Sequence, residues 1–179
     1  MEISKKHGVN FTYFVDAGFL HKLKLNSEKY PNLKQDYSAI SDQLKKLIKN
    51  GDDIQLHVHP HWEKAIYNGF KWEFNVKGCY SLSDFSNDKV VDIITNYKLE
   101  LESITGQKIT SYRAGGLAVQ PFLDIKKGLE LNNILIDSSV QHYGHKQTDS
   151  YGFDFRNAPL KGKYMLSLIH ISEPTRPLI

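Results

Sequence analysis

The chain has 179 residues, of which 40% are hydrophobic and 24% are charged, with a formal net charge of +3. This length and composition suit one ordinary globular domain. The basic residues are spread along the chain, which argues against a nucleic-acid partner. The single cysteine, Cys79, excludes an internal disulfide and a CxxC metal motif. No apolar run approaches the roughly 20 residues of a membrane-spanning helix, so we expect no membrane span.

The first third of the chain predicts a strand, a helix and a second strand. Residues 11–15 are aromatic and β-branched, as is typical of a strand. A polar, proline-containing loop is expected at 26–32. Residues 37–50 carry apolar side chains at helical spacing, and Gly51 stands where a C-cap glycine belongs. Residues 54–57 predict the second strand.

The next segments repeat this alternation after a long aromatic loop, residues 62–80. Apolar side chains at helical spacing predict a helix over 87–105, which Gly106 ends. A third strand follows at 109–113, and Pro121 suits the first turn of another helix. The last predicted strand spans 133–137.

Strict alternation of strands and helices favours parallel strands joined by right-handed crossovers. Both a doubly wound sheet and a (β/α) barrel satisfy this pattern. His57, Arg113 and Asp137 each stand at the C-terminal end of a predicted strand. Because that edge carries the chemistry of parallel α/β folds, we expect the three residues to cluster there.

The segment from Leu56 to Trp62 contains three histidines at alternate positions. His57 and His61 form an HxxxH pair, with Pro60 placed to turn the chain between them. Neutral imidazoles bind Zn²⁺ well, and such a pair supplies two of the three protein ligands of a catalytic site. An HxH pair of His57 and His59 is the alternative, because residues two apart on a strand share a face.

The other two polar residues carry weaker signals. Arg113 leaves its strand into Ala-Gly-Gly, which puts a fixed charge beside a backbone that a ligand can approach closely. Asp137 precedes two serines, a pattern that by itself marks a helix cap or a turn more often than a site.

Four segments resemble the NodB-homology polysaccharide deacetylases (carbohydrate esterase family 4-like), in particular the branch encoded among cell-surface polysaccharide genes. They are residues 5–15, the histidine segment GDDIQLHVHPHW at 51–62, SYRAGG at 111–116 and LIDSSV at 135–140. The resemblance covers residues 5 to about 165. It implies a distorted (β/α) barrel that hydrolyses N-acetyl or O-acetyl groups on a cell-surface or extracellular polysaccharide.

The resemblance also assigns roles to individual residues. It implies His57 and His61 as ligands of a divalent metal, with zinc favoured and cobalt, nickel or manganese as alternatives. It implies that Arg113 orients the catalytic aspartate, that a backbone N–H near Gly116 stabilises the oxyanion, and that Asp137 belongs to the later aspartate motif. Five aromatic residues are expected either to line a groove for the acetylated polymer or to pack over the barrel mouth, namely Trp62, Tyr67, Phe70, Trp72 and Tyr80.

The chain departs from the family pattern at both ends. The family's first strand, which ends in paired aspartates, is expected to lie upstream of Met1, and its final leucine–histidine motif is not found. We therefore interpret residues 1–165 as a partial domain that lacks its catalytic base and is inactive as given. Asp16 is the alternative for the missing aspartate. The tail LSLIHISEPTRPLI, residues 166–179, resembles a translated sequencing adaptor, so His170 is excluded from the site.

Two other function classes stay open. One is an amidohydrolase or phosphoesterase barrel that uses His57 and His59 as an HxH metal pair, completed by His142 or His145. The other is a carbohydrate-binding pseudoenzyme that kept the groove and lost the base.

Overall fold

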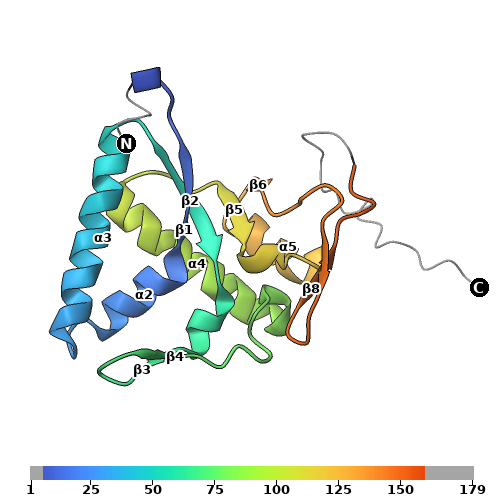
Figure 1. The fold of residues 1–179 in the computed structure, drawn as a ribbon, viewed down its shortest axis with the longest axis horizontal. Helices are drawn as coiled ribbons and strands as arrows, with labels where there is room; N and C mark the ends of the chain where they lie inside the picture. The colour runs from blue at the N-terminus through green and yellow to red at the C-terminus, as the bar shows by residue number, and fades with distance from the viewer. Residues whose placement is uncertain (1–5, 160–179) are drawn as a thin grey trace, which may run out of the picture.

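The computed structural model describes residues 6–159, in which four parallel strands form one sheet (Figure 1). The strand order is β1-β2-β5-β6, and the strands are β1 (Thr12–Asp16), β2 (Asp53–Val58), β5 (Ser111–Ala114) and β6 (Ile136–Asp137). The α/β class and the four predicted parallel strands are confirmed. In this part of the chain β1 and β6 are the edges of the sheet, and no pairing between them closes a barrel.

Four helices connect and cover these strands, namely α2 (Ala17–Asn26), α3 (Pro31–Lys49), α4 (Asn87–Thr105) and α5 (Phe122–Leu131). Helix α4 has the bounds that the sequence predicts. The Oγ of Ser86 caps its start by accepting the N–H of Lys89, and Gly106 ends it in the left-handed region at φ 69°. Helix α3 begins six residues before the predicted start, at Pro31, which suits a first helical turn.

Helix α2 is absent from the sequence prediction, which gave no element between the strand at 11–15 and the loop at 26–32. The helix begins directly after Asp16. A Cβ on Gly18 would lie 2.8 Å from the ring of Tyr97 and 2.9 Å from that of Trp62. The glycine therefore lets α2 pack closely against its neighbours.

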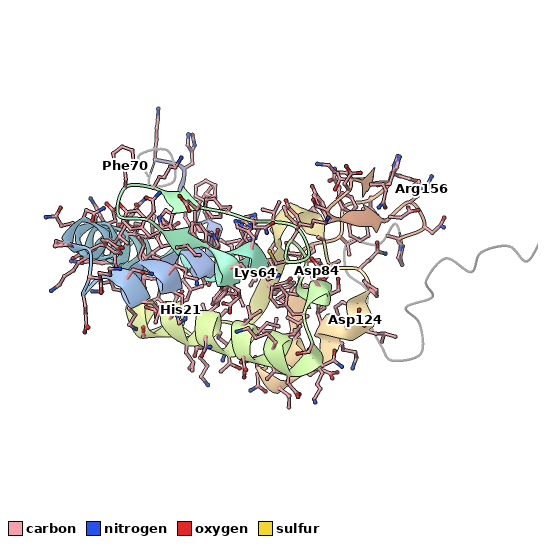
Figure 2. All side chains as sticks on the ribbon, turned by 90° about the horizontal axis from the view of Figure 1, so that it is seen from below. His21, Lys64, Phe70, Asp84, Asp124 and Arg156 are labelled. Carbon is pink, nitrogen blue, oxygen red and sulfur yellow. The ribbon has the colours of Figure 1, made fainter. Side chains whose placement is uncertain are left out.

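The core lies between one face of the sheet and the helices. Ile54, Leu56 and Val58 alternate along β2 and are fully buried. They pack with side chains of α4 in the main hydrophobic cluster, and Figure 2 shows α4 below the strands, with the segment carrying Phe70 on the opposite side. The intervening β2 residues, Gln55 and His57, therefore point away from this core.

The predicted aromatic loop contains regular structure. A 3₁₀ turn, η1 (Pro60–Lys64), leads into a hairpin of β3 (Ile66–Tyr67) and β4 (Trp72–Glu73). Residues 68–71 join the two strands, with Gly69 at φ 97°, and the Asn-Gly dipeptide that begins this loop is a known turn signal. Two further 3₁₀ turns are η2 (Leu82–Asp84) and η3 (Gly115–Leu117), and a second hairpin pairs β7 (His145–Gln147) with β8 (Gly152–Asp154).

Within residues 6–159, none of the helices is long and apolar enough to cross a membrane. The adaptor-like segment 166–179, with His170, lies outside the described residues.

Candidate functional site

The carboxyl ends of three neighbouring strands bring polar side chains together. In the parallel register, Asp16 of β1 pairs with His57 of β2, and His57 pairs with Arg113 of β5. The three residues share one side of the sheet because partners in register point the same way. The expected clustering of His57 and Arg113 is thus observed, and Asp16 joins them.

His57 is fixed by a backbone contact. Its Nδ1 lies 2.9 Å from the carbonyl oxygen of Arg113. Since a carbonyl only accepts, Nδ1 carries the hydrogen and Nε2 keeps a free lone pair. Burial and the nearby His59 lower the pKa of His57, which favours the neutral ring that a metal requires.

The three histidines form one cluster. The ring centroids of His57 and His59 are 4.5 Å apart, and those of His59 and His61 are 5.3 Å apart. The Nδ1 of His59 donates to Oδ2 of Asp16 at 3.0 Å. The Nδ1 of His61 is buried and has no hydrogen-bond partner among the described residues. Burial, together with His59, lowers the pKa of His61.

The imidazole nitrogens of this cluster are of the type that binds divalent metals such as zinc. His57 offers a free Nε2, and His61 carries a buried nitrogen without a partner. In the part of the chain that the structure describes, no three His, Cys, Asp or Glu side chains come together as a complete metal site. The convergence of His57 and His61 on one ion stays a prediction.

Arg113 and Asp137 both form hydrogen bonds with the loop after β6. The Nη1 of Arg113 donates to the carbonyl oxygen of Ser138 at 3.0 Å and to its Oγ at 3.1 Å. The Oδ1 of Asp137 accepts from the backbone N–H and the hydroxyl of Ser139, at 2.9 and 2.5 Å. The aspartate thus closes a turn, as one of the two sequence interpretations predicts.

The carboxyl group of Asp137 lies apart from the histidines. Asp137 pairs in register with the buried Tyr112 and so faces the core side of the sheet. Burial raises the pKa of Asp137 against the opposing contacts from Ser139 and Arg113. Asp137 therefore lies at the expected carboxyl edge of the sheet, but on the opposite face from His57.

Gly116 lies in the loop after Arg113, beneath two tyrosines. It adopts φ 57°, and a Cβ there would be 2.7 Å from the Oη of Tyr80. The ring of Tyr80 stacks on that of Tyr151 with centroids 4.0 Å apart. Because Tyr151 comes from the segment between β7 and β8, no local sequence pattern placed it here.

The two tryptophans, which were expected either to line a sugar groove or to pack over the barrel mouth, differ in exposure. Trp62 is 8% exposed, and its Nε1–H donates to Oδ2 of Asp16 at 2.8 Å. Trp72 is half-buried and lies edge-on to Trp62, with centroids 5.3 Å apart. Phe74, which is 48% exposed, packs against both Trp62 and His61. Trp62 is mainly a packing residue, and sequence reasoning missed the more exposed Phe74.

Gly115 should not tolerate a side chain, because its α-carbon faces the ring of His59. An added Cβ would collide with Cδ2 of His59 and lie 2.9 Å from both the Nε2 of His59 and the carbonyl oxygen of Val58. We expect Gly115→Ala to reduce the free energy of unfolding by about 1–3 kcal/mol, measured by urea denaturation. Combining it with His59→Ala should recover part of this loss, and simple additivity of the two effects would contradict the steric explanation.

Comparison of the chain with models of protein families, with curated proteins and with solved structures gave no match in any of the three searches. Statements about function therefore rest on the residues of this chain.

Proposed function

We propose that this chain carries the site of a metal-dependent deacetylase that acts on an acetylated sugar polymer, in a domain of the NodB-homology barrel type. The observation that supports this most is His57, held at the carboxyl edge of a parallel sheet with Nδ1 bonded to a carbonyl and Nε2 free. Metal-binding histidines commonly donate their other ring N–H in this way. The HVHPH segment and Arg113-Ala-Gly-Gly beside it match the order of the family's motifs.

In this proposal His57 and His61 hold the divalent metal, with zinc favoured. The ion, when bound, supplies Lewis-acid activation of the acetyl carbonyl and of the attacking water. Arg113 anchors the loop after β6 through its two bonds to Ser138. A backbone N–H near Gly116 stabilises the negative charge that develops on the carbonyl oxygen.

The described residues supply little acid–base help. Asp16 is the carboxylate in contact with the histidines, and its Oδ2 already accepts from His59 and Trp62. Asp137 faces the core side. General acid–base catalysis is worth about 10²–10⁴-fold in rate for each group, so we expect the chain as given to bind metal and substrate without appreciable turnover.

The test compares binding of acetylated and fully deacetylated chito-oligosaccharides to the Co²⁺-loaded chain by calorimetry. We expect the acetylated ligand to bind about tenfold more tightly, which corresponds to one hydrogen bond of about 1.4 kcal/mol. Chelating the metal should abolish this preference. Equal affinity for the two ligands, or a preference that survives chelation, would contradict the proposal. Acetate release that requires His57 would keep the function and reassign Asp16 as the base.

A second candidate is a hydrolase that uses His57 and His59 as an HxH pair. One observation favours it, because both residues bond an oxygen acceptor through Nδ1 and their rings are 4.5 Å apart. His61 has no such partner among the described residues. Alanine variants of His59 and His61 separate the two candidates, as argued in the Discussion.

A further inference from the structure

One carboxylate oxygen, Oδ2 of Asp16, bonds residues on both sides of His61. Oδ2 of Asp16 accepts the Nδ1–H of His59 at 3.0 Å and the Nε1–H of Trp62 at 2.8 Å. His59 lies directly before η1 and Trp62 lies within it, so the two donors stand on either side of His61 in the sequence. Asp16 itself is fixed at the end of β1, where it pairs in register with His57. The aspartate thus ties the turn that carries His61 to the strand ends that carry His57.

Two glycines make room for the rings that Asp16 holds. A Cβ on Gly115 would lie 2.9 Å from Nε2 of His59, and a Cβ on Gly18 would lie 2.9 Å from the indole of Trp62. Neither glycine adopts the left-handed region, so backbone conformation does not require glycine at these positions. These positions require glycine because the two rings need the space. The His59 ring is confined on the side away from the Nδ1 that bonds Asp16, and the Trp62 ring is confined at Cδ1, next to the Nε1 that bonds Asp16.

A bond to a charged acceptor is roughly twice as strong as one between neutral groups. Both side chains of the Asp16–His59 pair are 28% exposed, so water competes only partly for these bonds. Oδ1 of Asp16 is buried and has no hydrogen-bond partner among the described residues. The aspartate therefore carries a desolvation cost that a residue needed only for packing would avoid.

We infer that Asp16 is a positioning residue of the proposed metal site, which fixes the Pro60–Lys64 turn through His59 and Trp62 so that His61 is presented toward His57. This inference rests on the proposed function and assigns Asp16 neither as metal ligand nor as base. The inference also gives His59 a role, because the hydrogen bond of its ring to Asp16 links the end of β1 to the start of the turn.

The first test measures Co²⁺ affinity by calorimetry for the Asp16 variants. Outer contacts of metal-binding histidines are typically worth about 10–100-fold in affinity, and we expect Asp16→Ala to lose that much. Asp16→Asn keeps an acceptor oxygen without the charge, so its loss should be smaller. The matched control is Asp53→Asn, a carboxylate at the opposite end of the paired strands, whose Oδ1 accepts from Nε2 of Gln55. It should stay within about twofold of the parent chain, because the 10–100-fold figure applies to contacts of the histidines.

The second test needs no metal and reads the imidazoles directly by ¹⁵N NMR at neutral pH. In the parent chain His59 should show a protonated Nδ1 and an unprotonated Nε2. Asp16→Ala should convert it to a mixture of tautomers and shift the Nε1–H resonance of Trp62, while the amide spectrum stays that of a folded protein. Asp16→Asn should keep most of the parent pattern.

The outcomes separate the inference from the function. Parent-like Co²⁺ affinity in Asp16→Ala, or an unchanged His59 tautomer, would overturn the positioning role. If the parent chain binds no Co²⁺ at all, the proposed function fails, and the NMR spectra alone decide whether Asp16 fixes the turn. A loss of affinity in Asp16→Ala that Asp16→Asn partly restores supports the inference.

Discussion

Replacing His57 with alanine should remove measurable Co²⁺ binding from this chain. His57 has the most complete ligand geometry in the described residues, with Nδ1 held by the carbonyl of Arg113 and Nε2 free. Loss of a direct ligand should cost more than the roughly 100-fold upper value for an outer contact. Calorimetry and the visible absorption of Co²⁺ both measure this. The matched control is His7→Ala, which removes an exposed imidazole that belongs to neither candidate site.

The neighbouring histidines should differ from each other in the same experiment. His61→Ala should lose binding as His57→Ala does, because the proposal makes it the second ligand. His59→Ala should lose about 10–100-fold, as expected for a residue that acts through its contacts. The reverse result, with binding abolished by His59→Ala and retained by His61→Ala, would select the HxH hydrolase and refute the HxxxH ligand pair.

Glu100→Gln should lower the free energy of unfolding by about 2–3 kcal/mol at pH 7. Glu100 is 5% exposed on α4. It accepts from Tyr37 at 2.5 Å and from Lys24 at 3.0 Å, and His21 lies 3.8 Å away. Burial alone would raise the pKa of Glu100, but these three neighbours outweigh it and lower the pKa to about 2. Glutamine keeps an acceptor and loses the charge that the three groups stabilise.

The pH dependence follows from the direction of this pKa shift. A lowered pKa in the folded state gives stability that is complete above the ordinary value of 4.5 and is lost as the pH falls toward about 2. The difference between parent and Glu100→Gln should therefore be constant from pH 7 to 5 and shrink below that, measured by urea unfolding. Asp42→Asn, at an exposed pair with Lys45, should change stability by less than about 1 kcal/mol. A Glu100→Gln difference that keeps its full pH 7 size down to pH 3 would contradict this account.

The sequence predicted those elements whose signals are local. Helix α4 carries its own cap at Ser86, its buried stripe and its terminal Gly106, and its bounds were correct. Helix α2 was missed, and its Gly18 lets Tyr97 and Trp62 approach, a role that depends on residues distant in the sequence. The β3–β4 hairpin was missed although Asn68-Gly69 is a recognisable turn signal.

From the sequence, the site could be predicted only for residues that stand at the end of a recognisable strand. His57 and Arg113 were expected at one edge because each follows an apolar strand, and they pair in register there. The bond between His59 and Asp16 joins residues 43 positions apart, and it depends on how β1 aligns with β2. Asp137 stands at the expected edge, yet it faces the core because of its pairing with Tyr112, and no local pattern carries that information.

The ring cluster around Trp62 has a consequence for spectroscopy. The chain contains two tryptophans, and they lie 5.3 Å apart in this one cluster. Trp62 also stacks near His61, with centroids 5.7 Å apart. Tryptophan fluorescence of the whole protein therefore reports on the histidine turn and its surroundings. Emission quenched by an added paramagnetic ion would locate that ion without a label, and emission during denaturation would follow this turn rather than the distant end of α3.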